Sequence, residues 1–339
     1  MQLHCHLDGT VRAETFAELA ERYDVPTEYR RGDPSERFQA RQPVDSIYRF
    51  TGFQEFLFKF AAVCRSLQQP ADYARILYEY ADEALANGVM YAELFVSPST
   101  WRFFHHDLNL EEVFEALHHA AQDIEKRYSL PIRFIVDITR NFGPEKALES
   151  VQLAIALRHY GVVAVGLGGD EANHPATVFD GAFKAARDGG LHCVAHAGEA
   201  ADAQSVRDAV QILRAERIGH GIRALEDPDV VALLKDGNVT LEVCPTSNMK
   251  TGIVEKEPHP IRALYQAGVP LMIDSDDPAI FETDITREYA YAESLLGSDA
   301  LLLCAHQAIE ASFEDALAKA QMAQKLKEAS AELFPNRRS

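Results

Sequence analysis

The feature that most constrains the fold is a repeated alternation of short β-branched runs with long amphipathic segments. Short apolar runs rich in Val and Ile predict buried strands, and the segments between them have the length and periodicity of helices. Eight strands are expected, at residues 2–6, 89–96, 132–138, 162–167, 191–196, 216–219, 239–244 and 270–275. Strands that alternate with helices pair in parallel, so the predicted fold is α/β, a (β/α)8 TIM barrel.

Two parts of the chain exceed what a minimal barrel needs. Residues 7–88 separate the first strand from the second, and residues 288–333 form an alanine-rich, charged tail. We therefore expect extra helices after the first strand and at the C-terminus. The aromatic-rich stretch 50–60 is either a lid over the barrel mouth or a helix that packs its apolar face on the barrel. Because the chain shows no repeat and no Gly- or Ser-rich linker, residues 1–339 are predicted to form a single domain.

The composition excludes several kinds of partner. The 339 residues include 52 acidic and 33 basic side chains, which gives a formal charge of −19 at pH 7. Nucleic acid is normally bound by clustered Lys and Arg, so no nucleic-acid partner is expected. No apolar run approaches the ~18 residues of a membrane span, so no membrane partner is expected either. The first ten residues do not resemble a signal peptide and the five cysteines form no disulfide pattern, which predicts a cytoplasmic protein of unknown oligomeric state.

Polar residues gather where the predicted strands end. In a (β/α)8 barrel the active site lies at the C-terminal ends of the strands. Five of the eight ends carry histidine or carboxylate side chains, within residues 4–6, 168–171, 196–199, 219–221 and 274–277. The sequence therefore predicts one polar site at the mouth of the barrel.

His4 and His6 are the strongest indication of a bound metal. Side chains at i and i+2 of a strand point to the same face, so both imidazoles are expected inside the barrel. A divalent metal would satisfy two neutral imidazoles in an apolar interior, and His196 with a carboxylate from the eighth strand would complete the ligands. Such nitrogen and oxygen ligands suit zinc, although iron, cobalt or manganese would compete for the site.

One metal is expected instead of two. Many barrel hydrolases that begin with an H-x-H motif bridge two metals through a modified lysine at the end of the fourth strand, and residues 162–169 contain no lysine. The carboxylate ligand is less well defined by the sequence. Asp274, Asp276 and Asp277 compete for that role, and spacing alone does not choose between the last two.

Six motifs connect the chain to a known family. HCHLDGT, GLGGDE, VAHAGE, ERIGHG, LEVCPTSN and DSDDP occur in this order between residue 1 and about residue 285. They resemble the motifs of the adenosine deaminase family of the amidohydrolase superfamily. The resemblance implies one Zn²⁺ per chain, held by His4, His6, His196 and Asp276. It implies that Glu199 and His220 are catalytic, and that His6, Asp8, Gly169 and Asp277 bind the substrate.

The reaction implied by the resemblance is hydrolytic deamination of a 6-aminopurine nucleoside. Adenosine or deoxyadenosine would react with water to give inosine or deoxyinosine and ammonia. A water molecule activated by the metal would attack C6 while Glu199 protonates N1, for which Glu199 needs a pKa raised by a desolvated pocket. The alternative role for Glu199 is an exposed ion pair.

The substrate is less certain than the reaction. Asp8 in HLDG resembles the nucleoside-using branch of the family, because relatives that use free adenine tend to have glutamate there. GLGG departs from the DLAG pattern of many adenosine enzymes, which leaves a 5′-modified nucleoside such as 6-aminodeoxyfutalosine, an intermediate of menaquinone synthesis, as the second hypothesis. Free adenine is a further alternative. A nucleotide is not expected, because no Arg or Lys cluster follows a predicted strand.

Two hypotheses outside purine deamination remain. An amidohydrolase that acts on another C–N bond would share the same metal ligands. A catalytically inactive barrel could keep the histidines to bind metal or nucleoside. Glu199 and His220 argue against the inactive barrel, because neither residue is needed to hold the metal.

Overall fold

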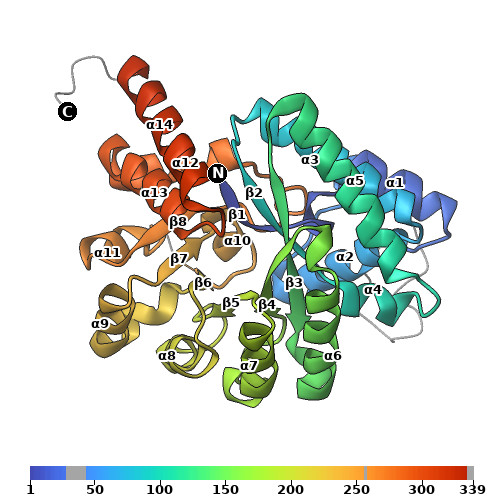
Figure 1. Ribbon diagram of the computed structural model, residues 1–339, viewed down its shortest axis with the longest axis horizontal. Helices are drawn as coiled ribbons and strands as arrows, with labels where there is room; N and C mark the ends of the chain where they lie inside the picture. Colours follow the sequence, from blue (N-terminus) through green and yellow to red (C-terminus); the bar gives the residue numbers. More distant parts are fainter. Residues whose placement is uncertain (28–42, 256–257, 334–339) are drawn as a thin grey trace.

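Eight parallel strands form the centre of the molecule (Figure 1). The computed structural model describes residues 1–27, 43–255 and 258–333. The strands follow one another around the sheet in chain order, as β1 (Gln2–His6), β2 (Ala92–Val96), β3 (Ile132–Thr139), β4 (Val162–Gly168), β5 (His192–Ala197), β6 (Arg217–His220), β7 (Thr240–Val243) and β8 (Leu271–Ile273). Backbone bonds between the segment after β8 and β1 bring the sheet close to a complete barrel: His6 N–H donates to Asp276 O and Asp276 N–H to His4 O. The predicted (β/α)8 barrel is confirmed.

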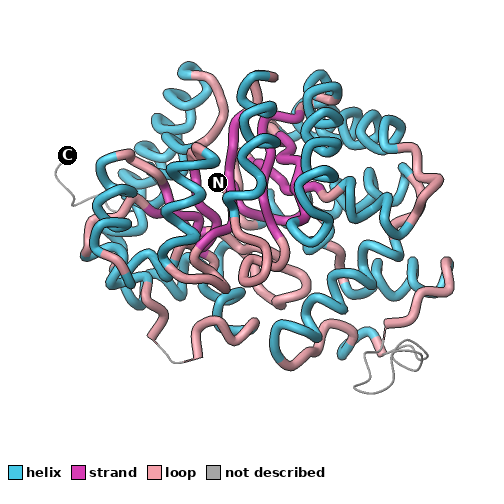
Figure 2. Tube along the Cα trace, turned by 90° about the horizontal axis from the view of Figure 1, so that it is seen from below, coloured by secondary structure: helices cyan, strands magenta, loops and turns pink. Residues whose placement is uncertain are grey.

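Helices surround the strands on the outside of the barrel (Figure 2). Between β2 and β8 they are α4 (Pro98–Phe104), α5 (Leu110–Tyr128), α6 (Gly143–Ala156), α7 (Asp180–Asp188), α8 (Ala203–Asp208), α9 (Pro228–Asp236), α10 (Pro245–Lys250) and α11 (Ile261–Gln266). The expected extra helices are present as α1 (Ala13–Arg22), α2 (Gly52–Ser66) and α3 (Pro70–Ala86) after β1, and α12 (Ile285–Leu296), α13 (Ser298–Ala311) and α14 (Ala316–Leu333) after β8. Within the described ranges, no helix is both long enough and apolar enough to cross a membrane.

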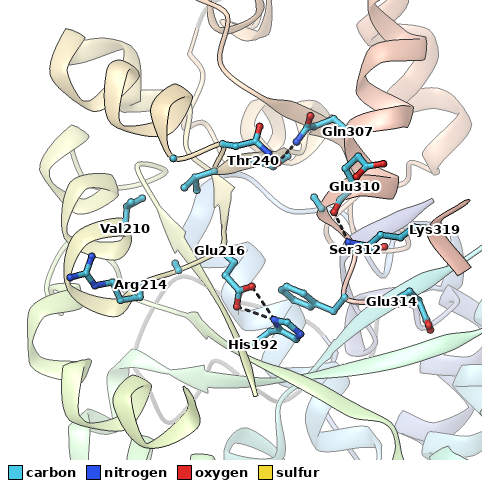
Figure 3. Close-up of a pocket in the computed structure, with 16 residues that line it drawn as sticks. His192, Val210, Arg214, Glu216, Thr240, Gln307, Glu310, Ser312, Glu314 and Lys319 are labelled. Carbon is cyan, nitrogen blue, oxygen red and sulfur yellow. Dashed lines mark hydrogen bonds and ion pairs between the residues drawn. The ribbon is translucent and has the colours of Figure 1, made fainter. Parts of the chain in front are cut away.

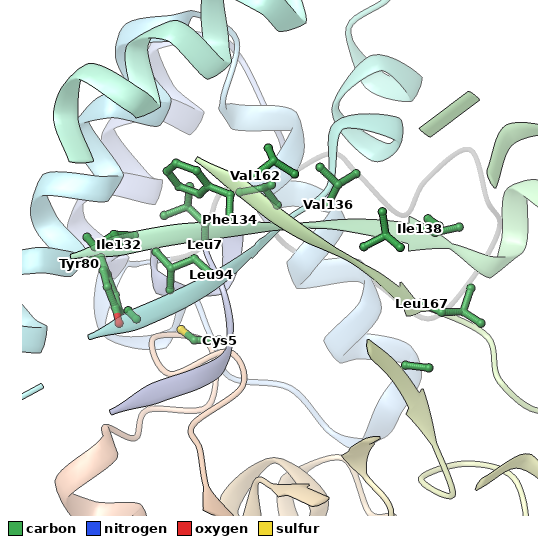
Figure 4. Close-up of a cluster of buried hydrophobic side chains, with 14 of the residues drawn as sticks. Cys5, Leu7, Tyr80, Leu94, Ile132, Phe134, Val136, Ile138, Val162 and Leu167 are labelled. Carbon is green, nitrogen blue, oxygen red and sulfur yellow. The ribbon is translucent and has the colours of Figure 1, made fainter. Parts of the chain in front are cut away.

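The apolar core lies between the strands and these helices. Side chains alternate along each strand, so one set faces outward to the helices while the next faces into the barrel. Figure 4 shows the outward set on the first four strands, where Leu94, Phe134 and Val136 pack with residues from neighbouring elements. Cys5 belongs to this outward set, as the alternation predicts for a residue between two inward histidines.

The stretch 50–60 lies mostly in the helix α2. Phe56 is buried, and its ring stacks on that of Phe281 with centroids 4.9 Å apart. Phe53, Leu57 and Phe60 lie on the wall of the cavity at the barrel mouth. One face of α2 therefore both packs on the barrel and encloses the polar site.

A buried ion network fills the opposite, N-terminal end of the barrel interior. The guanidinium of Arg217 donates to Glu93 and to Glu242, at 2.6 Å in each case, and all three side chains are almost completely buried. Glu93 also accepts hydrogen bonds from the Tyr91 hydroxyl and from the backbone N–H of Phe313. This network gives each buried charge at that end a partner.

Candidate active site

A cavity of about 300 Å³ opens at the C-terminal ends of the strands. Its walls combine the aromatic face of α2 with polar groups that follow β3, β4, β5, β6 and β8. Gly169, Glu199, His220 and Asp277 all line it, together with His6, His196 and Asp276. The barrel therefore brings to one place most of the residues that the sequence predicts for the site.

Four side chains form a compact cluster at the base of this cavity. One donor atom from each of His4, His6, His196 and Asp276 lies within 4.8 Å of the other three, and all four residues are buried. His6 Nε2 lies 3.3 Å from His196 Nε2 and 3.4 Å from Asp276 Oδ1, while His4 Nε2 lies 3.5 Å from the same Oδ1. Among the described residues, His4 Nε2 has no hydrogen-bond partner. The donor atoms of the four side chains therefore converge on one point.

Burial keeps most of these imidazoles neutral. It lowers the pKa of His6 to about 4 and the pKa of His196 well below its usual value, against the opposing effect of the Asp276 carboxylate. Burial also acts on His4, but the adjacent carboxylates of Asp276 and Glu242 outweigh it and raise the pKa of His4 well above its usual value. Neutral imidazoles beside an ionised carboxylate are the form in which these side chains bind a divalent metal.

A neighbouring carboxylate orients the first ligand of the cluster. His4 Nδ1 donates to Glu242 Oε2 at 2.5 Å, which leaves Nε2 directed at the cluster. Gly219 makes room for this ring, because a Cβ at that position would lie 2.6 Å from His4 Cε1. A carboxylate on the far nitrogen is the usual support of a metal-binding histidine.

Glu199 lies in the cavity wall and not on the surface. Its side chain is only 14% exposed, and Oε2 lies 3.6 Å from His220 Nε2. Burial, followed by the negative charges of Asp276 and Glu171, raises the pKa of Glu199 to about 8. The carboxyl group is therefore protonated at neutral pH, as the predicted proton donor must be.

Glu171 fixes the loop that carries Glu199, a role that the sequence did not reveal. Its carboxylate accepts hydrogen bonds from the backbone N–H groups of residues 198–201, at 2.6–3.2 Å, and from the Ser205 hydroxyl at 2.5 Å. Glu171 belongs to the polar group at the end of the fourth predicted strand, and that position was its only signal.

A chain of hydrogen bonds sets the orientation of His220. The backbone N–H of Ile261 donates to His259 Nδ1 at 3.1 Å, so His259 Nε2 carries the proton that it donates to Asn248 Oδ1. The amide nitrogen of Asn248 then donates to His220 Nδ1 at 3.1 Å. The proton of the neutral His220 ring therefore sits on Nε2, which lies 3.6 Å from Glu199 Oε2 and 3.9 Å from Asp276 Oδ2.

Backbone strain and close packing occur at the same place. His220 and Asp276 have φ values of 60° and 64°, in the left-handed region that side chains other than glycine rarely adopt. The Asp277 carboxylate presses against Gly9, where a Cβ would lie 2.1 Å from Oδ1. Burial and the adjacent Asp276 carboxylate raise the pKa of Asp277 well above its usual value.

Asp8 and Asp137 differ from the sequence-based picture. Asp8 is fully buried and accepts a hydrogen bond from Trp101 Nε1 at 2.8 Å, and it is not among the described residues that line the cavity. The structure thus does not bring Asp8 to the site, and its contact with a sugar stays a prediction. Asp137 on β3, which the sequence did not single out, lines the cavity, and burial raises its pKa to about 7.

A separate cavity lies at the N-terminal end of the barrel (Figure 3). Four of its polar side chains pair with one another: His192 Nδ1 lies 3.0 Å from Glu216, and Gln307 donates to Thr240 at 2.7 Å. No group of three or more metal-binding side chains was found there within the described residues. Of the described residues that line this cavity, one has a buried side-chain oxygen without a hydrogen-bond partner, Glu314, whereas several such atoms gather at the opposite end.

Comparisons with known proteins agree with this geometry. The family model for adenosine deaminase matches residues 1–329. The chain belongs to the adenosine deaminase family. Family members are metal-dependent amidohydrolases, so the chain is a hydrolase that acts on C–N bonds.

Named relatives in the family differ in substrate. The chain is 37% identical over 332 residues to the aminodeoxyfutalosine deaminase of Streptomyces avermitilis, covering 95% of this chain and 88% of the relative. It is 34% identical to the adenine deaminase of Sinorhizobium medicae, with 93% and 94% covered, and 34% identical to the adenosine deaminase of Shewanella loihica, with 89% and 90% covered. A solved amidohydrolase from Burkholderia ambifaria with bound zinc superposes with a TM-score of 0.85 at 25% identity, over 99% of this chain and 92% of that one.

Proposed function

We propose that this protein deaminates a 6-aminopurine nucleoside, converting adenosine or deoxyadenosine and water to inosine or deoxyinosine and ammonia. One Zn²⁺ per chain would be held by the cluster of His4, His6, His196 and Asp276. The cluster fits such an ion because its donor atoms converge, because one buried imidazole nitrogen has no hydrogen bond, and because the opposite nitrogen of His4 is anchored by Glu242. A divalent ion bound there would supply a water molecule activated for attack at neutral pH.

Glu199 is the observation that carries the proposal. It is a buried carboxyl group whose pKa is raised to about 8, and it lies at the same cavity as the cluster. A protonated carboxyl can give its proton to a purine ring nitrogen as the ring loses aromaticity, and the resulting carboxylate can take a proton from the attacking water. A barrel that only stored metal would have no use for a group tuned in this way.

The remaining wall residues suit binding and orientation. The N–H that His220 presents on Nε2 can donate to the oxygen of the attacking water, and Asp276 can accept from it. Asp277 in its protonated form can donate to a ring nitrogen of the purine. Gly169 lines the same wall with φ of 94°, where its small size lets a ligand approach the backbone.

The test is turnover of a small panel by zinc-loaded protein. Adenosine, deoxyadenosine and adenine are incubated with the wild-type protein and with Glu199→Gln, and ammonia release is measured together with the absorbance of the purine. We expect ammonia from the nucleosides with the wild-type protein and far less with the variant. Turnover of adenine alone would assign the base and not the nucleoside as substrate. No ammonia from any of the three compounds would contradict adenosine, deoxyadenosine and adenine as substrates.

A further inference from the structure

A second group of metal-binding side chains lies beside the cluster that would hold zinc. One donor atom from each of His220, Cys244 and Asp276 lies within 4.8 Å of the other two, and all three residues are buried. Asp276 belongs to both sets and divides its oxygens between them: Oδ1 lies 3.4 Å from His6 Nε2, and Oδ2 lies 3.9 Å from His220 Nε2. Because a carboxylate can give one oxygen to each of two ions, Asp276 could serve both sets at once.

The residue types of this second group suit a divalent ion. Cys244 follows β7, two residues after Glu242, and Glu242 points into the barrel, where it bonds to His4. The alternation of side chains along a strand therefore places Cys244 on the inner face as well. Thiolate, imidazole and carboxylate are all ligands of zinc. Composition alone would thus predict a second ion next to the first.

The hydrogen bonds of His220 oppose a second ion. The side-chain amide of Asn248 donates to His220 Nδ1 at 3.1 Å. This bond occupies the lone pair of Nδ1, so the ring proton sits on Nε2. A ring nitrogen must be free of its proton to bind a metal. Neither nitrogen of His220 is therefore available to an ion.

His259 holds the Asn248 amide in the orientation that this bond requires. The backbone N–H of Ile261 donates to His259 Nδ1 at 3.1 Å, and burial keeps the His259 ring neutral, with its pKa lowered to about 4. The single ring proton thus lies on Nε2, which donates to Asn248 Oδ1 at 3.1 Å. A flipped amide would place its NH₂ group against this N–H, with no acceptor between them. A backbone donor therefore determines, through two side chains, which nitrogen of His220 carries the proton.

His4 shows the opposite arrangement. Its Nδ1 donates to the Glu242 carboxylate at 2.5 Å, so Nε2 keeps its lone pair and faces the zinc cluster. An acceptor behind a histidine ring prepares the other nitrogen to bind metal, whereas a donor in the same place prepares it to donate a proton. The group behind each ring thus separates the ligand His4 from the proton donor His220.

We propose that Asn248 and His259 are positioning residues that keep the proton of His220 on Nε2 and thereby keep a divalent ion out of the second group. The same N–H is the one that would donate to the attacking water, so the expected effect on turnover rests on the proposed function. The expected number of bound ions does not, because it depends only on which nitrogen of His220 is free.

Asn248→Asp tests this with the smallest change of shape. It puts a carboxylate behind His220, as Glu242 stands behind His4, so that Nδ1 carries the proton and Nε2 becomes a ligand. Wild-type and variant protein are equilibrated with excess Zn²⁺, freed of unbound ion, and subjected to elemental analysis. We expect close to one ion per chain in the wild-type protein and close to two in the variant. The kcat for deamination should fall by about 10–100-fold with little change in KM, since the water loses its donor.

Two further variants assign the extra ion. Asn248→Asp combined with Cys244→Ala should return to about one ion per chain while kcat stays low, because the second group has lost a ligand. Asn238→Asp is the matched control, since Asn238 is an exposed asparagine of the cavity at the N-terminal end of the barrel. It adds the same charge and should change neither the ion content nor kcat.

A pair of substitutions at His259 tests the next bond of the chain. His259→Ala removes the donor to Asn248 Oδ1 and should lower kcat by about tenfold, whereas the amide of His259→Gln can still donate and should restore most of the activity. This pair decides the matter if Asn248→Asp does not fold.

Three results would overturn the proposal: a single ion in folded Asn248→Asp, a second ion that persists without Cys244, or equal kcat values for the two His259 variants. If the wild-type protein deaminates none of the purines, the proposed function fails, and the ion content of Asn248→Asp still decides whether the proton on His220 excludes the second ion.

Discussion

The two ends of the barrel interior both hold buried charge, but they satisfy it in opposite ways. At the N-terminal end, Arg217 is paired with Glu93 and Glu242, and the glutamates take further hydrogen bonds from the protein. At the C-terminal end, buried nitrogen and oxygen atoms of His4, Asp137 and Asp277 have no hydrogen-bond partner among the described residues.

This difference separates structural charges from functional ones. Unsatisfied polar atoms in a protein interior are costly, so several of them facing one cavity indicate that a ligand completes them. Buried charges that are already paired within the protein need no ligand. Glu242 connects the two ends, since one of its oxygens holds Arg217 and the other holds His4. The ion network at the N-terminal end thereby helps to orient His4 at the C-terminal end.

The largest expected effect is at the C-terminal end of the barrel interior. Glu199→Gln keeps the size of the side chain but cannot cycle a proton, so kcat should fall by about 10²–10⁴. The variant should retain zinc and should still bind a ground-state purine, because Glu199 lies outside the metal cluster. It should bind a hydrated-ring transition-state analogue much less tightly. Measuring kcat, analogue affinity and metal content on one preparation checks all of these; a wild-type rate would remove Glu199 from the chemistry.

The next largest effect is expected at the N-terminal end of the barrel interior. Arg217→Met leaves Glu93 and Glu242 buried without their guanidinium, and the free energy of unfolding should fall by about 3–5 kcal/mol. Denaturant unfolding of the zinc-loaded protein measures this. Arg223→Ala, which removes an exposed arginine paired with Glu226, is the control and should change the value by less than about 1 kcal/mol. Equal effects of the two variants would mean that the buried network does not stabilise the barrel.

A smaller effect is expected from Glu171, whose carboxylate accepts hydrogen bonds from the loop that carries Glu199. Glu171→Gln should lower kcat by about 10–100-fold, because an amide cannot accept all the N–H groups that hold the Glu199 loop. Loss of the Glu171 charge also lowers the pKa of Glu199. The loss of activity at high pH should therefore begin at a lower pH in the variant than in the wild-type protein. Ser205→Ala removes one neutral donor and is the control. A pH–rate profile that does not move in Glu171→Gln would leave Glu171 a purely structural role.

The smallest effect concerns metal-free protein. The pKa of Glu199 is about 8 in the folded state against a usual 4.5, so the folded state holds a proton that the unfolded state releases between these values. Stability from this group is thus present at low pH and lost as the pH rises toward 8. Metal-free Glu199→Gln should therefore melt a few degrees above the metal-free wild-type protein at pH 8, with little difference at pH 4. Melting curves that keep the same offset at both pH values would contradict this.

The strands and the histidine cluster could be predicted because both depend on local patterns. β-branched runs mark the strands, and the two-residue spacing of His4 and His6 fixes their common face. Asp137 could not be singled out, because one acidic residue inside an apolar run gives no sign that it faces a cavity. Glu171 was missed for a related reason: its partners are backbone N–H groups, which have no sequence signature.

Metal content per chain tests the central claim most directly. Wild-type, His196→Ala and His220→Ala protein are each dialysed against trace zinc and subjected to elemental analysis. The wild-type protein and His220→Ala should each hold close to one equivalent of zinc, and His196→Ala should hold little or none. The account predicts that activity disappears with the metal in His196→Ala, and that His220→Ala keeps its metal while its turnover slows strongly. Two tightly held ions per wild-type chain, or zinc retained at wild-type level in His196→Ala, would contradict a single metal held by His4, His6, His196 and Asp276.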